Sequence, residues 1–320
     1  MPSTINLTDA THKLEYFSFI IIGGIGLITN LLNILVSTKK EIKKTNMGFY
    51  NIILSIFNVF ALLSRTLQIM PSIGQQDLLL TSQVACITIP YFARLSSQIC
   101  LWINVLISFD RLFLMSYENF AAYKNRYIKD SKKQLKMITV IFFILSMVNI
   151  PGTFFHLETQ KTFNNATNLT TVSIECTSTA LIVVIRDSLS VIFRILLPLV
   201  IQVIISYILV YKLLRLEINV NSLSLKREYK FTFTIVILNV LFIFTDLLIL
   251  IGLILINVYG YNQTYISTSS NQSAIASFFY LCSVVFALFN ICDCLFFVNL
   301  VTNMKFRKEF KKIFLKIIKF

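Results

Sequence analysis

The chain has 320 residues, of which 56% are hydrophobic and only 14% are charged, and its mean hydropathy is +0.75. Soluble domains carry about 25% charged residues, so this composition excludes an ordinary soluble domain and indicates a helical membrane protein. The formal net charge of +14 would suit nucleic-acid binding, but the positions of the basic residues predict a membrane face instead.

Seven apolar runs are each long enough to cross a hydrocarbon core of about 30 Å as a helix. We therefore expect an all-α fold, a seven-transmembrane helix bundle with a short amphipathic helix on the membrane surface at its C-terminal end. An extracellular N-terminus (residues 1–15) would precede the bundle (16–301), and a cytoplasmic amphipathic tail (302–320) would follow it. The runs lie at residues 16–37, 47–70, 84–113, 135–155, 181–212, 229–257 and 276–301.

Basic residues and glycosylation sequons fall on opposite sets of connections. Of the 29 lysines and arginines, 23 lie in or border the connections that follow the first, third, fifth and seventh runs, and the positive-inside bias assigns these connections to the cytoplasm. The sequons lie in the N-terminus and after the fourth and sixth runs, which predicts an outer location. We therefore expect a multi-pass plasma-membrane protein with its N-terminus outside, whose basic side faces anionic lipid and a cytoplasmic partner and not nucleic acid. The sequon asparagines are Asn6, Asn165, Asn168, Asn262 and Asn271.

The tail carries apolar residues near helical spacing. Residues 305–320 read KFRKEFKKIFLKIIKF, with lysines between the phenylalanines and isoleucines. This pattern predicts an amphipathic helix along the inner membrane face. A basic flank that stops membrane transfer would explain the lysines but not the apolar periodicity.

The third run has a cysteine at one end and a charged pair at the other. Cys86 precedes Arg111 by 25 residues, and Asp110 stands directly before that arginine. This spacing in a third span resembles rhodopsin-like (class A) G protein-coupled receptors, which place a cysteine at this distance before the arginine of an Asp-Arg-Tyr motif. Leu112 takes the place of the tyrosine. The resemblance extends over about residues 16–315 and implies a receptor that binds an extracellular ligand and activates a heterotrimeric G protein.

The resemblance implies roles for both ends of this run. The outer cysteine of the family forms a disulfide with the second outer loop, where Cys176 is the sole cysteine and the compartment is oxidising. This implies a Cys86–Cys176 bridge, with two free cysteines as the alternative. Asp110 would hold Arg111 at rest, and Arg111 would engage the G protein on activation. The alternative for Arg111 is a helix-end side chain that reaches lipid phosphate.

Positions in the other spans match the family in part. Asn30 corresponds to the asparagine of the first span that hydrogen-bonds between helices. Asn58 replaces an aspartate of the second span that helps to bind sodium, so we favour a role for it in crosslinking helices. Pro198 corresponds to the proline of the fifth span, and Phe242 to a phenylalanine of the sixth.

The sixth and seventh spans depart furthest from the family. Asp246 stands where the sixth span usually has tryptophan, and Asn299 stands where the seventh usually has tyrosine. The family's Asn-Pro-x-x-Tyr motif is absent from the seventh span. The hypothesis is that Asn290 and Asp293 provide some of the polar contacts that this motif makes in the family. These departures indicate a divergent, orphan-type receptor.

Charged residues within the spans are candidate ligand contacts, because charge inside a membrane is costly and usually functional. The basic residues outnumber their possible acidic partners, so an acidic group such as a peptide's C-terminal carboxylate would suit them. The basic residues are Arg65, Arg94, Arg186 and Arg194, and the acidic ones are Asp187 and Asp246. Internal pairing, for example of Arg194 with Asp246, is an equal alternative. An amine ligand is disfavoured, because Ala93 occupies the position of the aspartate of amine receptors.

Two other function classes remain as alternatives. A transporter or channel would tend to show repeated halves and helices broken by glycine or proline, whereas this chain has eight glycines, five prolines and no evident repeat. A membrane enzyme would need a catalytic motif, but HExxH and GxSxG are absent. The six cysteines and two histidines form no cluster. We therefore expect no enzyme activity, no cofactor and no metal.

Overall fold

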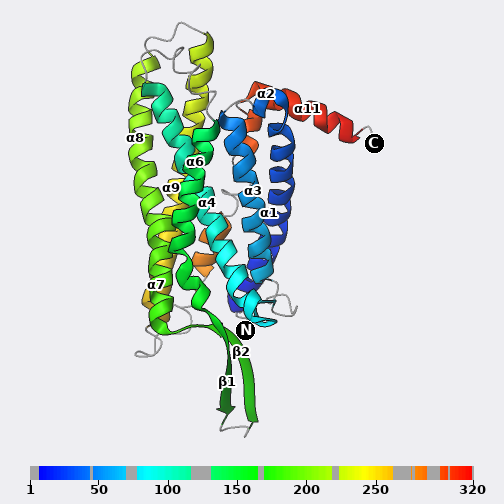
Figure 1. Ribbon diagram of the computed structural model, residues 1–320, viewed down its shortest axis with the longest axis vertical. Helices are drawn as coiled ribbons and strands as arrows, with labels where there is room; N and C mark the ends of the chain where they lie inside the picture. Colours follow the sequence, from blue (N-terminus) through cyan, green and yellow to red (C-terminus); the bar gives the residue numbers. More distant parts are fainter. Residues whose placement is uncertain are drawn as a thin grey trace, which may run out of the picture.

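The computed structural model describes residues 7–43, 46–69, 78–116, 131–164, 169–217, 223–261, 275, 278–286, 296–301 and 303–318. Long helices form a bundle, a β-hairpin projects from one end, and a short helix lies across the other end (Figure 1). The α-helices are α1 (Leu7–Ser37), α2 (Lys40–Lys43), α3 (Asn46–Ile69), α4 (Gln83–Ser116), α6 (Ser131–Val148), α7 (Ala180–Val191), α8 (Leu197–Glu217), α9 (Leu223–Tyr261) and α11 (Met304–Ile318). The other elements are the 3-10 helices η2 (Leu78–Leu80) and η3 (Ile150–Phe154), the π-helix η4 (Ile192–Leu196), and strands β1 (His156–Asn164) and β2 (Leu169–Thr177).

In the described part of the chain, five helical stretches are long and apolar enough to cross a membrane. They correspond to the first, second, third, fifth and sixth predicted runs. The fourth run forms α6, but that helix has 18 residues of which three are lysines, and it ends earlier than expected. Pro151 explains the early end, because proline lacks the N–H that a continuing helix needs and instead begins η3. Residues 278–286 and 296–301 of the seventh run are helical, and residues 287–295 lie outside the described part.

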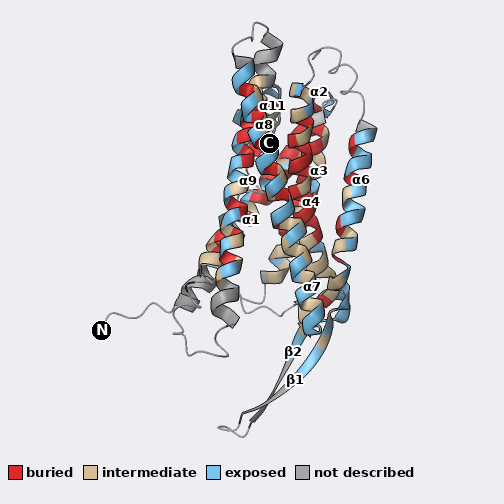
Figure 2. Ribbon diagram, turned by 90° about the vertical axis from the view of Figure 1, so that its left-hand side faces the viewer, coloured by how far each residue is buried: buried red, intermediate tan, exposed pale blue. Residues whose placement is uncertain are grey.

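Helix α4 occupies the centre of the bundle and packs against α3, α6, α8 and α9. Its residues are buried almost continuously from Leu95 to Ile107, because the sequence is apolar or uncharged on every face there. Figure 2 shows the buried residues concentrated on the central helices and facing sides of the bundle. The outward faces remain apolar, with Ile28, Phe60, Phe143 and Phe244 all exposed. Such faces fit lipid and not water.

The β-hairpin corrects the expectation of a purely helical fold. Strands β1 and β2 pair antiparallel from His156 opposite Thr177 to Asn164 opposite Leu169. Residues 156–177 were expected to form a loop, although their threonine, valine and isoleucine residues favour strands. The hairpin extends away from the bundle (Figure 1).

Helices α7, η4 and α8 follow one another without a break, and the π-helical turn lies just before Pro198. Proline cannot donate a backbone hydrogen bond, and its ring crowds the carbonyl group four residues earlier, which here belongs to Arg194. A widened turn accommodates both effects. The indole Nε1 of Trp102 on α4 donates to the carbonyl oxygen of Phe193, 3.0 Å away, and so fixes this turn to the central helix.

Helix α11 confirms the predicted amphipathic tail. Phe306 has an exposed fraction of 0% and packs with Val36, Ile42 and Phe296, while lysines of the same helix are exposed. The rings of Phe296 and Phe306 are 5.8 Å apart between centroids, in an edge-to-face arrangement. At the same end, α2 approaches α3 so closely that a Cβ on Gly48 would clash with the carbonyl oxygen of Ile42.

Candidate functional site

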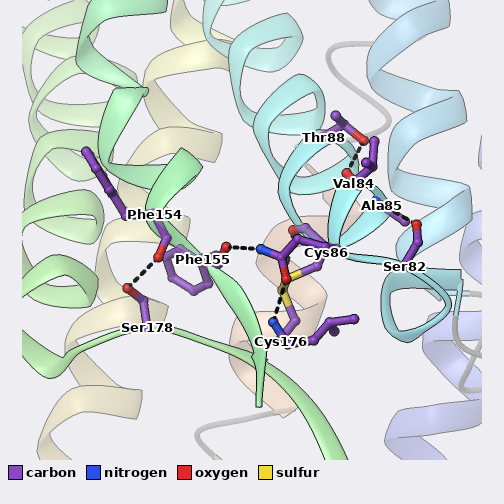
Figure 3. Close-up of a disulfide and its surroundings, with 11 residues drawn as sticks. Ser82, Val84, Ala85, Cys86, Thr88, Phe154, Phe155, Cys176 and Ser178 are labelled. Atoms are coloured by element: carbon purple, nitrogen blue, oxygen red, sulfur yellow. Dashed lines mark hydrogen bonds between the residues drawn. A yellow bond between two sulfur atoms is a disulfide. The ribbon is translucent and has the colours of Figure 1, made fainter.

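The disulfide predicted from the sequence is present and ties the hairpin to the start of α4. Cys86 and Cys176 are bonded, with their Cα atoms 5.7 Å apart (Figure 3). The side chain of Gln83, one turn before Cys86, makes two further links. Its Nε2 donates to the carbonyl oxygen of Phe155 (2.8 Å), and its Oε1 accepts from the backbone N–H of Leu157 (2.9 Å). The base of the hairpin is therefore held to α4 by one covalent bond and two hydrogen bonds.

The charged residues predicted as ligand contacts come together in space. Arg65 on α3, Arg94 on α4 and Arg194 on η4 interact electrostatically with one another, and Arg194 also interacts with Asp246 on α9. Of the three arginines, Arg194 is the one that interacts with Asp246, and the four residues together carry a net charge of about +2 if all are ionised. We call these four residues the arginine cluster.

Neighbouring residues position the arginine cluster. Arg65 Nη1 donates to Gln68 Oε1 on the same helix at 3.1 Å. Tyr280 is within electrostatic range of Arg65 and packs against α9 at Gly252, where an added Cβ would lie 3.1 Å from the Tyr280 Cα. A side chain at position 252 would therefore require Tyr280 to shift by a few tenths of an ångström.

Asp246 is buried, with an exposed fraction of 3%, and its Oδ2 has no hydrogen-bond partner among the described residues. It makes no ion pair with Arg194 within 4.0 Å in that part of the chain. Arg194 and Asp246, whose pairing was the predicted alternative to ligand binding, therefore interact electrostatically without direct contact. Asp246 is thus the buried member of the cluster, whereas its three arginines are only half-buried.

The charged pair at the other end of α4 is also buried. Asp110 and Arg111 have exposed fractions of 8% and 6%, which places them within the bundle and not on a lipid-facing surface. Lys212 Nζ of α8 donates to Ser116 Oγ of α4 at 2.6 Å, so the ends of these two helices are joined here. The connection of residues 117–130 that follows α4 lies outside the described part.

Two asparagine contacts crosslink the first helices. Asn58 Nδ2 on α3 donates to Asn30 Oδ1 on α1 at 3.0 Å. One turn away, Asn33 Nδ2 on α1 donates to Ser55 Oγ on α3 at 2.7 Å. This arrangement agrees with the crosslinking role predicted for Asn30 and Asn58, and the Asn33–Ser55 contact adds a second link that the sequence analysis missed.

A small cavity between α3, α4, α9 and residues 296–301, lined by six apolar and four polar residues, was not predicted from the sequence. Asn104, Ser108, Asn239 and Asn299 line a space of about 10 Å³, together with the predicted core residue Phe242. Ser108 donates to Asn239 Oδ1 at 2.9 Å, whereas the Asn299 side chain has no hydrogen-bond partner among the described residues. Polar residues four apart within an apolar run, as at 104 and 108, are the signal that could have found it.

The remaining predicted residues are placed as follows. Pro198 is buried directly after the π-helical turn. Asn290 and Asp293 lie outside the described residues, and so do all the predicted glycosylation sites, Asn6, Asn165, Asn168, Asn262 and Asn271.

A scan against protein-family models and a search of curated proteins both found no match to this chain.

Proposed function

We propose that this chain is a seven-helix signalling receptor of the rhodopsin-like type, which binds an extracellular ligand and activates a heterotrimeric G protein. It lies in the plasma membrane with its N-terminus outside and its C-terminal helix against the inner leaflet. The observation that carries the proposal is the organisation of α4. This helix is the buried centre of the bundle, with a disulfide at one end and a buried Asp-Arg pair at the other.

The ligand site lies in the half of the bundle nearest the disulfide. Support comes from the arginine cluster, in which residues of α3, α4 and η4 converge with Asp246 of α9. Charges inside a membrane protein are expensive unless they pair or bind a ligand. The excess of positive charge favours an anionic ligand, and a peptide with a free C-terminal carboxylate is one candidate.

The G protein site lies at the opposite end of the bundle. Support comes from the burial of Asp110 and Arg111, because a buried guanidinium can change partners when the helices around it move. The basic helix α11 and the lysines of α2 lie at this same end (Figure 1). Such a surface suits both the anionic inner leaflet and an acidic protein partner.

The experiment is a ligand screen in cells that express the surface-tagged protein together with sensors for each G protein class. A ligand should activate at least one class, and Arg65→Ala or Arg94→Ala should lower its potency at equal surface expression. Exposed Arg215 at the far end of α8 provides a matched control, since Arg215→Ala should leave ligand binding unchanged. Ligand-driven transport or an ion current without G protein activation would favour the transporter or channel class instead.

A further inference from the structure

A second basic feature lies beside the disulfide, at the outer side of α4. A cavity of about 140 Å³ is bounded by α4, η3 and α7 together with the start of the hairpin. Its walls are partly apolar and partly charged. They include the Cys86–Cys176 bridge, Leu79, Pro90, Phe155 and two arginines, Arg94 and Arg186.

Arg186 is held in a fixed position in this wall. Its Nε and Nη2 bind the two carboxylate oxygens of Asp187 at 2.7 and 3.0 Å, and its Cζ lies 4.3 Å from the centre of the Phe155 ring. In the described part of the chain, Nη1 of Arg186 makes no hydrogen bond. The Asp187 side chain is 54% exposed, so water screens the electrostatic attraction between Asp187 and Arg186.

Arg94, on α4, also lines the cavity and has fewer hydrogen-bond partners than Arg186. In the described part of the chain its guanidinium makes no ion pair or hydrogen bond, although it interacts electrostatically with Arg186, Asp187 and Arg194. The cavity wall therefore carries two guanidinium groups, and the nearby acid, Asp187, is already bound to one of them. An arginine fork matches the two oxygens of a carboxylate in both geometry and charge.

The size of the cavity limits what can accompany the anion. An engineered protein cavity of about 150 Å³ accommodates a benzene molecule, so a space of this size suits one ring or a short aliphatic group. Leu79, Pro90 and Phe155 supply the apolar surface for such a group. We propose that this cavity binds a carboxylate that carries a ring-sized apolar group, with Arg94 and Arg186 as its anion contacts. The acid is either a free organic acid or the C-terminal residue of a peptide, and its role as a signal rests on the receptor function proposed above.

The test uses the full-length purified protein in detergent micelles, without any G protein. Benzoate and N-acetylphenylalanine serve as probes for a free acid and a peptide end, and their uncharged amides, benzamide and N-acetylphenylalaninamide, serve as controls. Binding is measured from the concentration-dependent rise in melting temperature and by calorimetry. At least one acid should bind, and its amide should not. The acid that binds more tightly shows whether the carboxylate comes from a free acid or from a peptide end.

Variants then assign the contacts. Arg94→Gln and Arg186→Gln should each weaken binding of the acid by about tenfold or more, as expected for a lost charged hydrogen bond. Asp187→Asn should strengthen it severalfold, because it removes the carboxylate that competes for Arg186. Arg215→Gln, at the far end of α8, should have no effect. If Arg94→Gln does not fold, the changes at 186 and 187 still decide the matter.

Equal binding of acid and amide would overturn the proposal, as would unchanged affinity in both arginine variants. Either result would leave the receptor function standing, because no G protein takes part in the measurement. Conversely, a failure to activate any G protein would leave the carboxylate site standing.

Discussion

Trp102 on the central helix donates a hydrogen bond from Nε1 to the carbonyl oxygen of Phe193, 3.0 Å away, in the π-helical turn that carries Arg194. The single tryptophan of the chain therefore joins the helix that carries Asp110–Arg111 to the turn that supplies one member of the arginine cluster. Because η4 is widened next to Pro198, this contact fixes a turn that lacks regular helical bonding. The two ends of the proposed receptor are connected through it.

Replacing Trp102 tests the importance of this contact. Trp102→Phe keeps an aromatic ring but removes the donor, and should lower the free energy of unfolding by about 1–3 kcal/mol. Thermal unfolding in detergent measures this loss. Tyr91→Phe is the matched control, because the Tyr91 hydroxyl is a long 3.4 Å from the carbonyl oxygen of Ser146. Equal destabilisation by the two changes would show that the Trp102 hydrogen bond has no special role.

The disulfide should contribute substantially to stability. It closes a sequence separation of 90 residues, and removing a native disulfide typically costs about 2–5 kcal/mol. Cys86→Ser should therefore reduce the amount of protein at the cell surface, and Cys86→Ser with Cys176→Ser should be no worse than either change alone. Cys282→Ser, which removes a free cysteine, is the control. Surface expression of Cys86→Ser equal to that of the unchanged protein would contradict a structural role for the bridge.

The asparagine pair between α1 and α3 should show direct coupling. The contact from Asn58 to Asn30 is 3.0 Å long and buried, and hydrogen bonds between membrane helices average about 0.6 kcal/mol with a maximum of about 1.7. A double-mutant cycle with Asn30→Ala and Asn58→Ala should give a coupling energy in this range. A parallel cycle on Asn33 and Ser55 provides the comparison. A coupling energy of zero for the first pair would remove its assigned role.

The arginine cluster should be sensitive to its one carboxylate. Asp246→Asn removes the negative charge that interacts with Arg194 and should lower the melting temperature, because the arginines then repel one another without compensation. Adding Arg194→Gln to Asp246→Asn should restore part of the loss. If the double variant is less stable than Asp246→Asn alone, the two charges do not compensate each other, and the cluster is arranged differently.

Local patterns predicted much of this architecture. The length of the apolar runs predicted the long helices, and the periodicity of residues 305–320 predicted α11. Both signals depend on residues near one another in the chain. The hairpin was missed because strand pairing depends on contact between two segments, and β1 has no alternating pattern to indicate a partner. The alternation of apolar and polar residues from Val172 to Cys176 in β2 was a local signal for a strand. The cavity at Asn239 and Asn299 was missed for a related reason, since it exists only where four separate helical segments meet.

The most direct test of the receptor account concerns Arg111, at the end of α4 opposite the disulfide. Nucleotide exchange on each class of heterotrimeric G protein is measured in membranes that contain equal surface amounts of the unchanged protein, Arg111→Ala and the control Glu158→Ala, which changes an exposed residue of the hairpin at the other end of the bundle. We expect exchange above background on at least one class for the unchanged protein and for Glu158→Ala, and exchange at background for Arg111→Ala. Exchange that is equal for Arg111→Ala and the unchanged protein, on every class, would contradict it.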